Sequence, residues 1–237
     1  RMVTINAENA YKTAGLSVNE YMETVTSFSA SLIANLGGDT VRAAEYADRA
    51  IIDMADNANK MGTSIDLIQN AYQGFAKGSY AMLDNLKLGY GGTMTEMARL
   101  INDSGILGDE MINLADKQNI GAALQEVGFA KITEAIHIMQ ERLGIAGATA
   151  QEAEGTIQGS LAMVSSSWKN LITDIVIGGD ALPDSIDKLV SSVGIASKNL
   201  MPAIKSALAG IATLIEEVVP ILIEALPGII KEVVPAL

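Results

Sequence analysis

The chain has 237 residues, of which 49% are hydrophobic, and it carries a formal net charge of −12. This hydrophobic content excludes wholesale disorder and is sufficient for one or two domains with a packed core. The acidic balance, with Lys and Arg scattered singly, argues against a nucleic-acid-binding face and against strong attraction to anionic lipid. The absence of cysteine excludes disulfides, thiolate catalysis and thiolate metal sites.

Helix start and stop signals recur along the first part of the chain. Ser17–Glu20 fits a capping box and predicts a helix that ends at Gly37-Gly38. Asp39 is typical of an N-cap, and it predicts a second helix that ends at Gly62. The apolar residues expected to face the core are Tyr21, Val25, Phe28, Leu32 and Leu36 on the first helix, and Val41, Ala44, Ile51, Met54, Ala58 and Met61 on the second.

Four more helices are predicted further along. Thr63–Asp66 and Thr93–Glu96 have the spacing of capping boxes, a long helix is expected over residues 120–143, and Thr149–Glu152 begins another. The residues expected to face the core on the first three are Ile68, Tyr72 and Phe75; Met94, Met97 and Ile101; and Ile132, Ile136, Met139 and Leu143.

The helix that begins at Thr149 has the most regular apolar pattern. Its apolar residues are spaced 4, 3, 4, 3 and 4, which is typical of a coiled-coil seam. We therefore expect Trp168, in the middle of the seam, to be buried. No segment alternates apolar and polar residues for long, so the fold class is predicted to be all-α, with multiple short-to-medium helices. The seam residues are Ile157, Leu161, Val164, Trp168, Leu171 and Ile175.

A change of composition near Gly178-Gly179 predicts two parts. Residues 1–178 are expected to form a helical domain, and residues 179–237 an apolar, proline-punctuated helical segment. All ten aromatic residues lie at or before Trp168. The second part therefore lacks the large aromatic side chains that usually dominate a core, and we expect its Ala, Ile, Leu and Val side chains to pack on one another or on a partner.

The second part also repeats itself. Glu217–Leu222 returns as Glu232–Leu237, with a period of 15 residues. Because proline removes an amide donor and kinks or breaks a helix, we expect a series of short apolar helical pieces. The chain begins at Arg1 and ends inside this repeat, so we expect it to be an internal piece of a longer protein, in which the repeated region continues.

Few residues are candidates for chemistry. His137 is the only histidine, and with Glu134 it has the Glu-x-x-His spacing of carboxylate-bridged di-iron bundles. Such a site needs a second copy of the motif and two more Glu, so we expect a solvated, weakly paired His137. The sequence Gly89–Gly92 lacks the Gly-Lys-Ser/Thr of a phosphate loop, which favours a plain turn, although the helix start that follows leaves anion binding open. Adjacent carboxylates such as Glu216 and Glu217 point about 100° apart on a helix and are normally solvated. The sequence therefore predicts no catalytic, cofactor-binding or metal-binding residue, and no enzyme.

The apolar segment 201–237 is the feature with a functional interpretation. Its longest uncharged stretch, Ser206–Ile215, is half of the about 20 apolar residues that a membrane span requires. Packing against a partner or against copies of itself is therefore favoured. A membrane-perturbing or pore-assembling helical module is the alternative.

Three segments also carry a resemblance to a known family. Residues 63–92, 132–147 and 149–175 resemble, in the same order, the tape-measure region of tail proteins from long-tailed, siphovirus-type phages and prophages. The resemblance covers residues 5–178. Its most specific pieces are 69–76 (QNAYQGFA), 82–92 (MLDNLKLGYGG) and 156–160 (TIQGS) followed by Trp168.

The resemblance implies a structural virion component that sets tail length and organises assembly of the tail tube, and that is later expelled during DNA ejection. It implies a location in the lumen of the tail tube, after assembly in the cytoplasm of the bacterial host. The implied partners are the tail-tube protein, tail assembly chaperones, baseplate or distal tail proteins and other copies of the chain, with possible membrane contact during ejection. The wall-hydrolase domains of some relatives need a catalytic Glu or a His/Cys site that this stretch lacks.

Overall fold

The structure, a computed structural model, describes residues 2–177 and 181–233. In these ranges the chain forms nine α-helices, one short 3₁₀ helix and no strand, which confirms the all-α prediction. The elements are α1 (Met2–Thr13), α2 (Val18–Asn35), α3 (Thr40–Met61), α4 (Ile65–Ala76), η1 (Leu83–Leu86), α5 (Met94–Ser104), α6 (Ile120–Arg142), α7 (Ala148–Gly155), α8 (Ile157–Ile177) and α9 (Leu182–Val233). The glycines at the predicted boundary, 178 and 179, and the last four residues of the second repeat lie outside the described residues.

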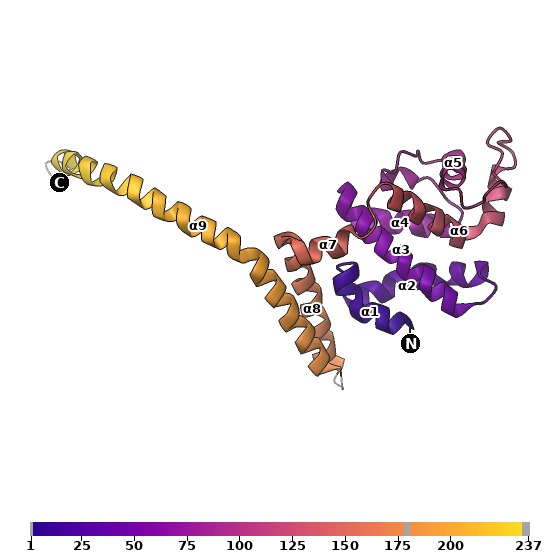
Figure 1. Ribbon diagram of the computed structural model, residues 1–237, viewed down its shortest axis with the longest axis horizontal. Coiled ribbons are helices and arrows are strands. Elements are labelled where there is room, and N and C mark those ends of the chain that lie inside the picture. Colours follow the sequence, from indigo (N-terminus) through magenta and orange to yellow (C-terminus); the bar gives the residue numbers. More distant parts are fainter. Residues whose placement is uncertain (1, 178–180, 234–237) are drawn as a thin grey trace.

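Helices α1 to α6 pack around one hydrophobic core (Figure 1). The three phenylalanines of the chain all belong to it. Phe28 of α2 meets Phe129 of α6 edge-on, with ring centroids 5.9 Å apart. Most residues predicted to face the core are buried here, among them Tyr21, Leu32, Ile51, Met54, Tyr72, Phe75, Met97, Ile101, Ile132 and Ile136.

Three residues assigned to the core are instead exposed. Val41 lies in the first turn of α3, ahead of the buried face that begins at Ala43. Met94 is the first residue of α5, and Leu143 follows the last residue of α6. Each lies at a helix end, where the neighbouring helix no longer covers the side chain. The spacing of apolar residues does not show where this cover ends, so it assigned these three residues to the core.

The predicted N-cap hydrogen bonds form fully at some helix starts and only partly, or not at all, at others. Ser17 and Glu20 form the full capping box, with the Ser17 amide donating to Glu20 Oε2 over 2.8 Å. Asp39 accepts from two amides of α3. At Thr93 only half of the box forms, because the Glu96 carboxylate accepts from the Gly91 amide instead. Before α4, Ser64 is the N-cap and makes no side-chain cap hydrogen bond.

The long helix α6 contains a break at Gly128. This residue has φ 76° and ψ 161°, a conformation that disfavours a side chain. The Asn35 side chain at the end of α2 accepts a hydrogen bond from the Phe129 amide beside the break. The contact ties α2 to α6 and leaves the second half of α6 aligned along α3.

The single helix predicted from Thr149 is wrong: two helices, α7 and α8, replace it. Thr156 between them has φ −121° and ψ 156°, which is extended backbone. Its hydroxyl accepts from the Gly159 amide and so caps α8. A Cβ on Gly159 would lie 2.3 Å from the carbonyl oxygen of Glu152, so only glycine fits where α8 turns across the end of α7.

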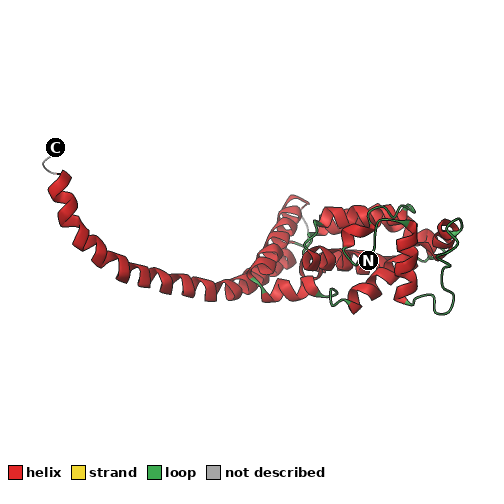
Figure 2. Ribbon diagram, turned by 90° about the horizontal axis from the view of Figure 1, so that it is seen from above, coloured by secondary structure: helices red, strands yellow, loops and turns green. Residues whose placement is uncertain are grey.

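The prediction of short helical pieces is also wrong for the described part of the second segment. Helix α9 is one helix of 52 residues and runs through Pro202 and Pro220. These prolines are 18 residues apart, five turns at about 3.6 residues per turn, so both lie on one side of the helix. Each removes one amide donor, and α9 bows rather than ends (Figure 2).

Candidate interaction surface

Helix α8 is fixed to the helical domain along one side. The Ser166 hydroxyl donates to the Gly15 carbonyl over 2.8 Å, and the Asn170 side-chain oxygen accepts from the Val18 amide over 2.8 Å. Lys169 forms an ion pair of 2.6 Å with Glu20. This side of α8 therefore faces the turn between α1 and α2.

A second side of α8 packs against the first part of α9, and the two helices form an antiparallel hairpin (Figure 1). Small polar residues make this contact. The hydroxyls of Ser167 and Ser192 lie 2.7 Å apart, and both residues are buried. Asn199 of α9 donates to the Thr156 carbonyl at the start of α8. Helices with small residues at the contact approach each other closely, so little apolar surface is needed to hold the pair.

The prediction that Trp168 is buried is wrong. Leu171 of the predicted seam is buried and Val164 is partly buried, but the other four seam residues are exposed: Ile157, Leu161, Trp168 and Ile175. Trp168 is 53% exposed. Ser167 contacts α9, and the buried Ser160 lies seven residues earlier on the same side of α8. Leu161 and Trp168 each follow one residue later, about 100° further around the helix. The seam therefore lies beside the hairpin contact, away from the side that Asn170 fixes to the domain.

The exposed stripe continues on α9. Ser185 and Ser192 face α8, and Ile186 and Val193 again follow one residue later. In an antiparallel pair, the same rotation from the contact brings both stripes to the same side of the hairpin. The hairpin thus has one apolar face, here called the hairpin face, that consists of Leu161, Trp168, Ile172, Ile175, Ile186 and Val193.

Beyond the hairpin, α9 extends away from the helical domain (Figures 1 and 2). Every side chain described from residue 201 to residue 221 is exposed. Ile204 and Ile211 lie 18 residues after Ile186 and Val193, hence on the same side of the helix. We call these exposed large apolar side chains the distal face: Met201, Ile204, Leu208, Ile211, Leu214, Ile215, Val218, Val219 and Ile221. A contiguous exposed apolar surface of this kind is a candidate interaction site.

Because Trp168 is half exposed, its replacement by Ala should lower the free energy of unfolding of the monomer by less than about 1 kcal/mol. Urea unfolding at a concentration where the chain is monomeric measures this. A loss of about 3–5 kcal/mol, the range for a buried Trp, would contradict the exposed position.

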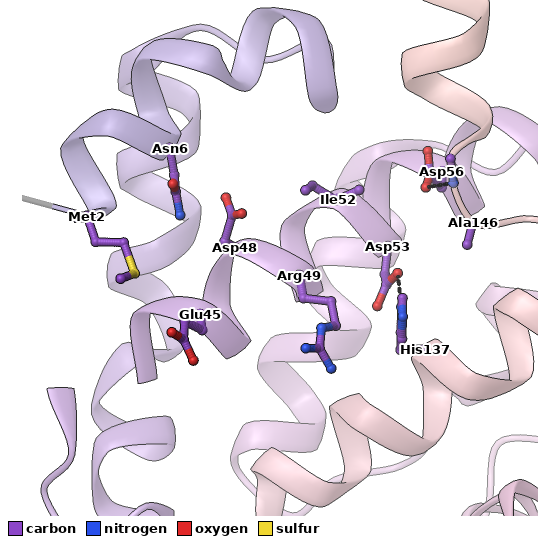
Figure 3. Close-up of a pocket in the computed structure, with 11 residues that line it drawn as sticks. Met2, Asn6, Glu45, Asp48, Arg49, Ile52, Asp53, Asp56, His137 and Ala146 are labelled. Atoms are coloured by element: carbon purple, nitrogen blue, oxygen red, sulfur yellow. Dashed lines mark hydrogen bonds and ion pairs between the residues drawn. The ribbon is translucent and has the colours of Figure 1, made fainter. Parts of the chain in front are cut away.

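A second site candidate is a polar cluster between α3 and α6 (Figure 3). His137 Nδ1 lies 2.8 Å from Asp53 Oδ1, and Asp53 is only 2% exposed. The prediction of a solvated, weakly paired His137 is therefore wrong. Asp53 lies beside Met54 on the buried face of α3 and is a polar residue within an apolar stripe. A polar residue at such a position is the sequence signal that could have predicted the pair.

Four other charged groups of the cluster have partners within the protein. Glu134 forms an ion pair with Arg49 of α3 rather than acting with His137. The Tyr21 hydroxyl donates to Asp48 over 2.6 Å, and Asp56 accepts from two amides at the start of α7. A cavity of about 570 Å³ adjoins these groups, and the residues that line it include no Ser, Thr, Tyr or Cys. Its lining therefore lacks the hydroxyl or thiol nucleophile that an Asp–His pair activates in a catalytic triad.

Burial and pairing shift the pKa values of this pair in one direction. Burial raises the pKa of Asp53 from 3.8 to about 6, although His137 opposes the rise. The hydrogen bond with Asp53 raises the pKa of His137 above 6.5. Both groups hold their protons more tightly in the folded state than in the unfolded state.

The pair should therefore stabilise the fold at low pH and less so as pH rises. The Asp53 contribution is lost between pH 3.8 and about 6, and the His137 contribution as pH passes its folded-state pKa above 6.5. The difference in unfolding free energy between the wild type and Asp53→Asn/His137→Gln should shrink steadily over this window, as measured by denaturant unfolding. A difference that grows with pH would contradict the assignment.

The glycine-rich loop Gly89–Gly92 forms a turn packed on α5. Arg99 lies over the Tyr90 ring and donates to the Gly89 carbonyl. A Cβ on Gly92 would lie 2.2 Å from the Ala81 carbonyl oxygen, which explains the glycine by close backbone approach. The Gly91 amide donates a hydrogen bond to the Glu96 carboxylate, so an anion that approached this amide would meet a negative charge.

No group of three or more His, Cys, Asp or Glu suitable for a metal ion occurs among the described residues. Within the same residues, no helix is long and apolar enough to cross a membrane. Searches against family models, curated proteins and solved structures returned no match to this chain. Of the two candidates, the hairpin and distal faces expose large apolar side chains. In the polar cluster, Glu134, Asp48 and Asp56 are paired within the protein, whereas the buried Asp53 Oδ2 accepts no hydrogen bond.

Proposed function

We propose that this chain is a structural, non-enzymatic part of a tail tape-measure protein from a long-tailed phage or prophage. The exposed apolar surface of α8 and α9 carries the proposal: a compact helical domain continues into one helix of 52 residues, and every side chain described from residue 201 to residue 221 of that helix is exposed. At about 1.5 Å per residue, α9 alone is about 78 Å long. A long continuous helix with exposed apolar side chains is the element that a ruler inside a tube requires.

The resembling segments also have a structural meaning in this fold. The piece 69–76 lies in α4 and contributes Tyr72 and Phe75 to the core, and the piece 82–92 forms η1 with the glycine-rich turn. The piece 156–160 forms the junction between α7 and α8. The resemblance therefore concerns residues that build the domain and set the direction of the hairpin.

In the proposed role, the hairpin and distal faces contact the tail-tube protein and other copies of the chain within the tube lumen. Tail assembly chaperones would cover the same faces in the host cytoplasm before the tube closes, since such surfaces aggregate when free. Baseplate or distal tail proteins would hold one end. The chain would leave the tube ahead of the DNA at ejection.

Tail length tests this proposal. Inserting about 100 helix-forming residues after Val233 in the encoding phage should lengthen the tail by about 150 Å, at about 1.5 Å per residue. Electron microscopy of the tails measures the change. As the control, replacing a helical stretch by an equal number of other helix-forming residues should leave the length unchanged. Tails of unchanged length after the insertion would contradict the ruler role.

A membrane-perturbing or pore-assembling module in genome delivery is the second candidate, and the distal face favours it because nine large apolar side chains are exposed there. Dye release from lipid vesicles tests this alternative directly. The wild type should release dye, and Ile211→Glu should not, if the distal face inserts. Equal, low release by both would count against membrane action.

A further inference from the structure

We propose that the distal face of α9 binds the hairpin face of a second copy of this chain, and that the exchange is reciprocal. Each copy would insert the stretch 201–221 of its α9 alongside α8 and the first part of α9 of the other. The inference names one partner for the surface on which the proposed function rests.

The hairpin face has the shape of an incomplete helical bundle. Two antiparallel helices that expose apolar side chains on one common side form an open half of a helical bundle. Trp168 stands on α8 and Val193 on α9, both beside the Ser167–Ser192 contact. A third helix laid over this contact covers both stripes at once and completes a three-helix bundle.

The hairpin face and the distal face have the same spacing of apolar residues. Distal residues Ile204, Ile211 and Val218 recur every seven residues, which is the spacing of Leu161, Trp168 and Ile175 and also of Ile186 and Val193. The two faces therefore agree in period.

An antiparallel orientation of the two α9 helices brings the two faces together. When α9 of one copy runs antiparallel to α9 of the other, with the two-fold axis near Pro202, Ile211 of one lies beside Val193 of the other. The same register places Val218 beside Ile186. All four side chains are exposed in the single chain. Both hairpins are occupied in this arrangement, so the assembly closes as a dimer.

The apolar area of the two faces can be compared with the area that a stable interface buries. A fully exposed Val, Leu or Ile side chain presents roughly 60–120 Å² of apolar surface, so the nine half-exposed side chains of the distal face present roughly 270–540 Å². A stable interface buries about 800 Å² on each partner. Adding the hairpin face brings the total to roughly 500–1,000 Å² per copy. Pairing of the distal faces alone falls short of about 800 Å², whereas the upper part of the range for the reciprocal exchange reaches it.

The experiment uses the fluorescence of Trp168, the only tryptophan of the chain. In the wild type, dilution across the micromolar range should shift the Trp168 emission to longer wavelength as sedimentation reports conversion of dimer to monomer. Leu161→Asp on the hairpin face and Ile211→Asp on the distal face should each give a monomer with exposed Trp168. Ser206→Asp, on the opposite side of α9 from Ile211, is the matched control and should remain a dimer. Circular dichroism checks that every variant is folded.

Mixing the two variants provides the decisive result. A heterodimer of Leu161→Asp and Ile211→Asp retains one intact hairpin face and the one intact distal face that fits it, so the mixture should regain dimer that neither variant forms alone. Three results would overturn the proposal: a monomeric wild type, a dimer whose Trp168 emission does not change on dilution, or a Leu161→Asp variant that dimerises like the wild type. None of these concerns tail length, so failure here is distinguishable from failure of the ruler role.

Discussion

Replacing Phe28 by Ala should lower the free energy of unfolding by about 3–5 kcal/mol, the range for removing a buried aromatic side chain. Phe28 is 1% exposed and lies between α2 and α6, where it meets Phe129 edge-on at 5.9 Å. Truncation leaves a cavity in a close-packed core and removes an aromatic pair worth about 0.5–1.5 kcal/mol. Urea unfolding followed by circular dichroism measures the loss.

The matched control is Phe28→Leu, which keeps most of the volume and should cost clearly less. Trp168→Ala removes a larger aromatic side chain from an exposed position and should cost less still. The order of the three losses therefore tests whether the core lies among α1 to α6 or along α8. Equal losses for Phe28→Ala and Trp168→Ala would place the assignment of the core in doubt.

The fold was predictable to the extent that local signals determine it. The Ser17–Glu20 box and the Asp39 cap act over three or four residues, and the structure has both where the sequence predicts them. The same is true of the apolar stripe of α2, which spacing alone assigns to the core. Such features need no knowledge of what packs against the helix.

The exposed seam of α8 shows where such reasoning stops. Spacing shows that Leu161 and Trp168 share a side of a helix, but it does not tell whether the same chain covers that side. The hairpin contact includes Ser167 instead, because small residues let the two helices approach closely. Spacing therefore identifies an apolar stripe correctly, but it does not show that the stripe lies outside the hairpin contact.

The polar cluster was missed for a related reason. His137 and Asp53 are 84 residues apart, and their pairing depends on α6 packing along α3. A single sequence gives no long-range pairing, so His137 was judged from its own helix and expected to be solvated. Asp53 and Asp56 interrupt the buried face of α3, and polar residues at core positions are the signal that a partner exists elsewhere in the fold.

Replacing Asp56 by Ala should lower the free energy of unfolding by about 2–5 kcal/mol, since two amides at the start of α7 lose their acceptor and each costs about 1–3 kcal/mol when left unpaired. Asp56 is fully buried, and its two oxygens accept from the Gly147 amide over 2.5 Å and from the Thr149 amide over 2.7 Å. A carboxylate at a helix N-terminus also meets the positive end of the helix dipole.

Asp56→Asn is the matched control, because its amide oxygen retains one acceptor and the loss should be smaller. Denaturant unfolding measures both losses, and hydrogen exchange at Gly147 and Thr149 reports the freed amides directly. Since α7 leads into α8, Asp56 is also the anchor from which the hairpin and its apolar face are positioned on the domain. A loss below about 1 kcal/mol, with unchanged exchange at both amides, would mean that contacts of α8 with α1 and α2 hold the hairpin without this anchor.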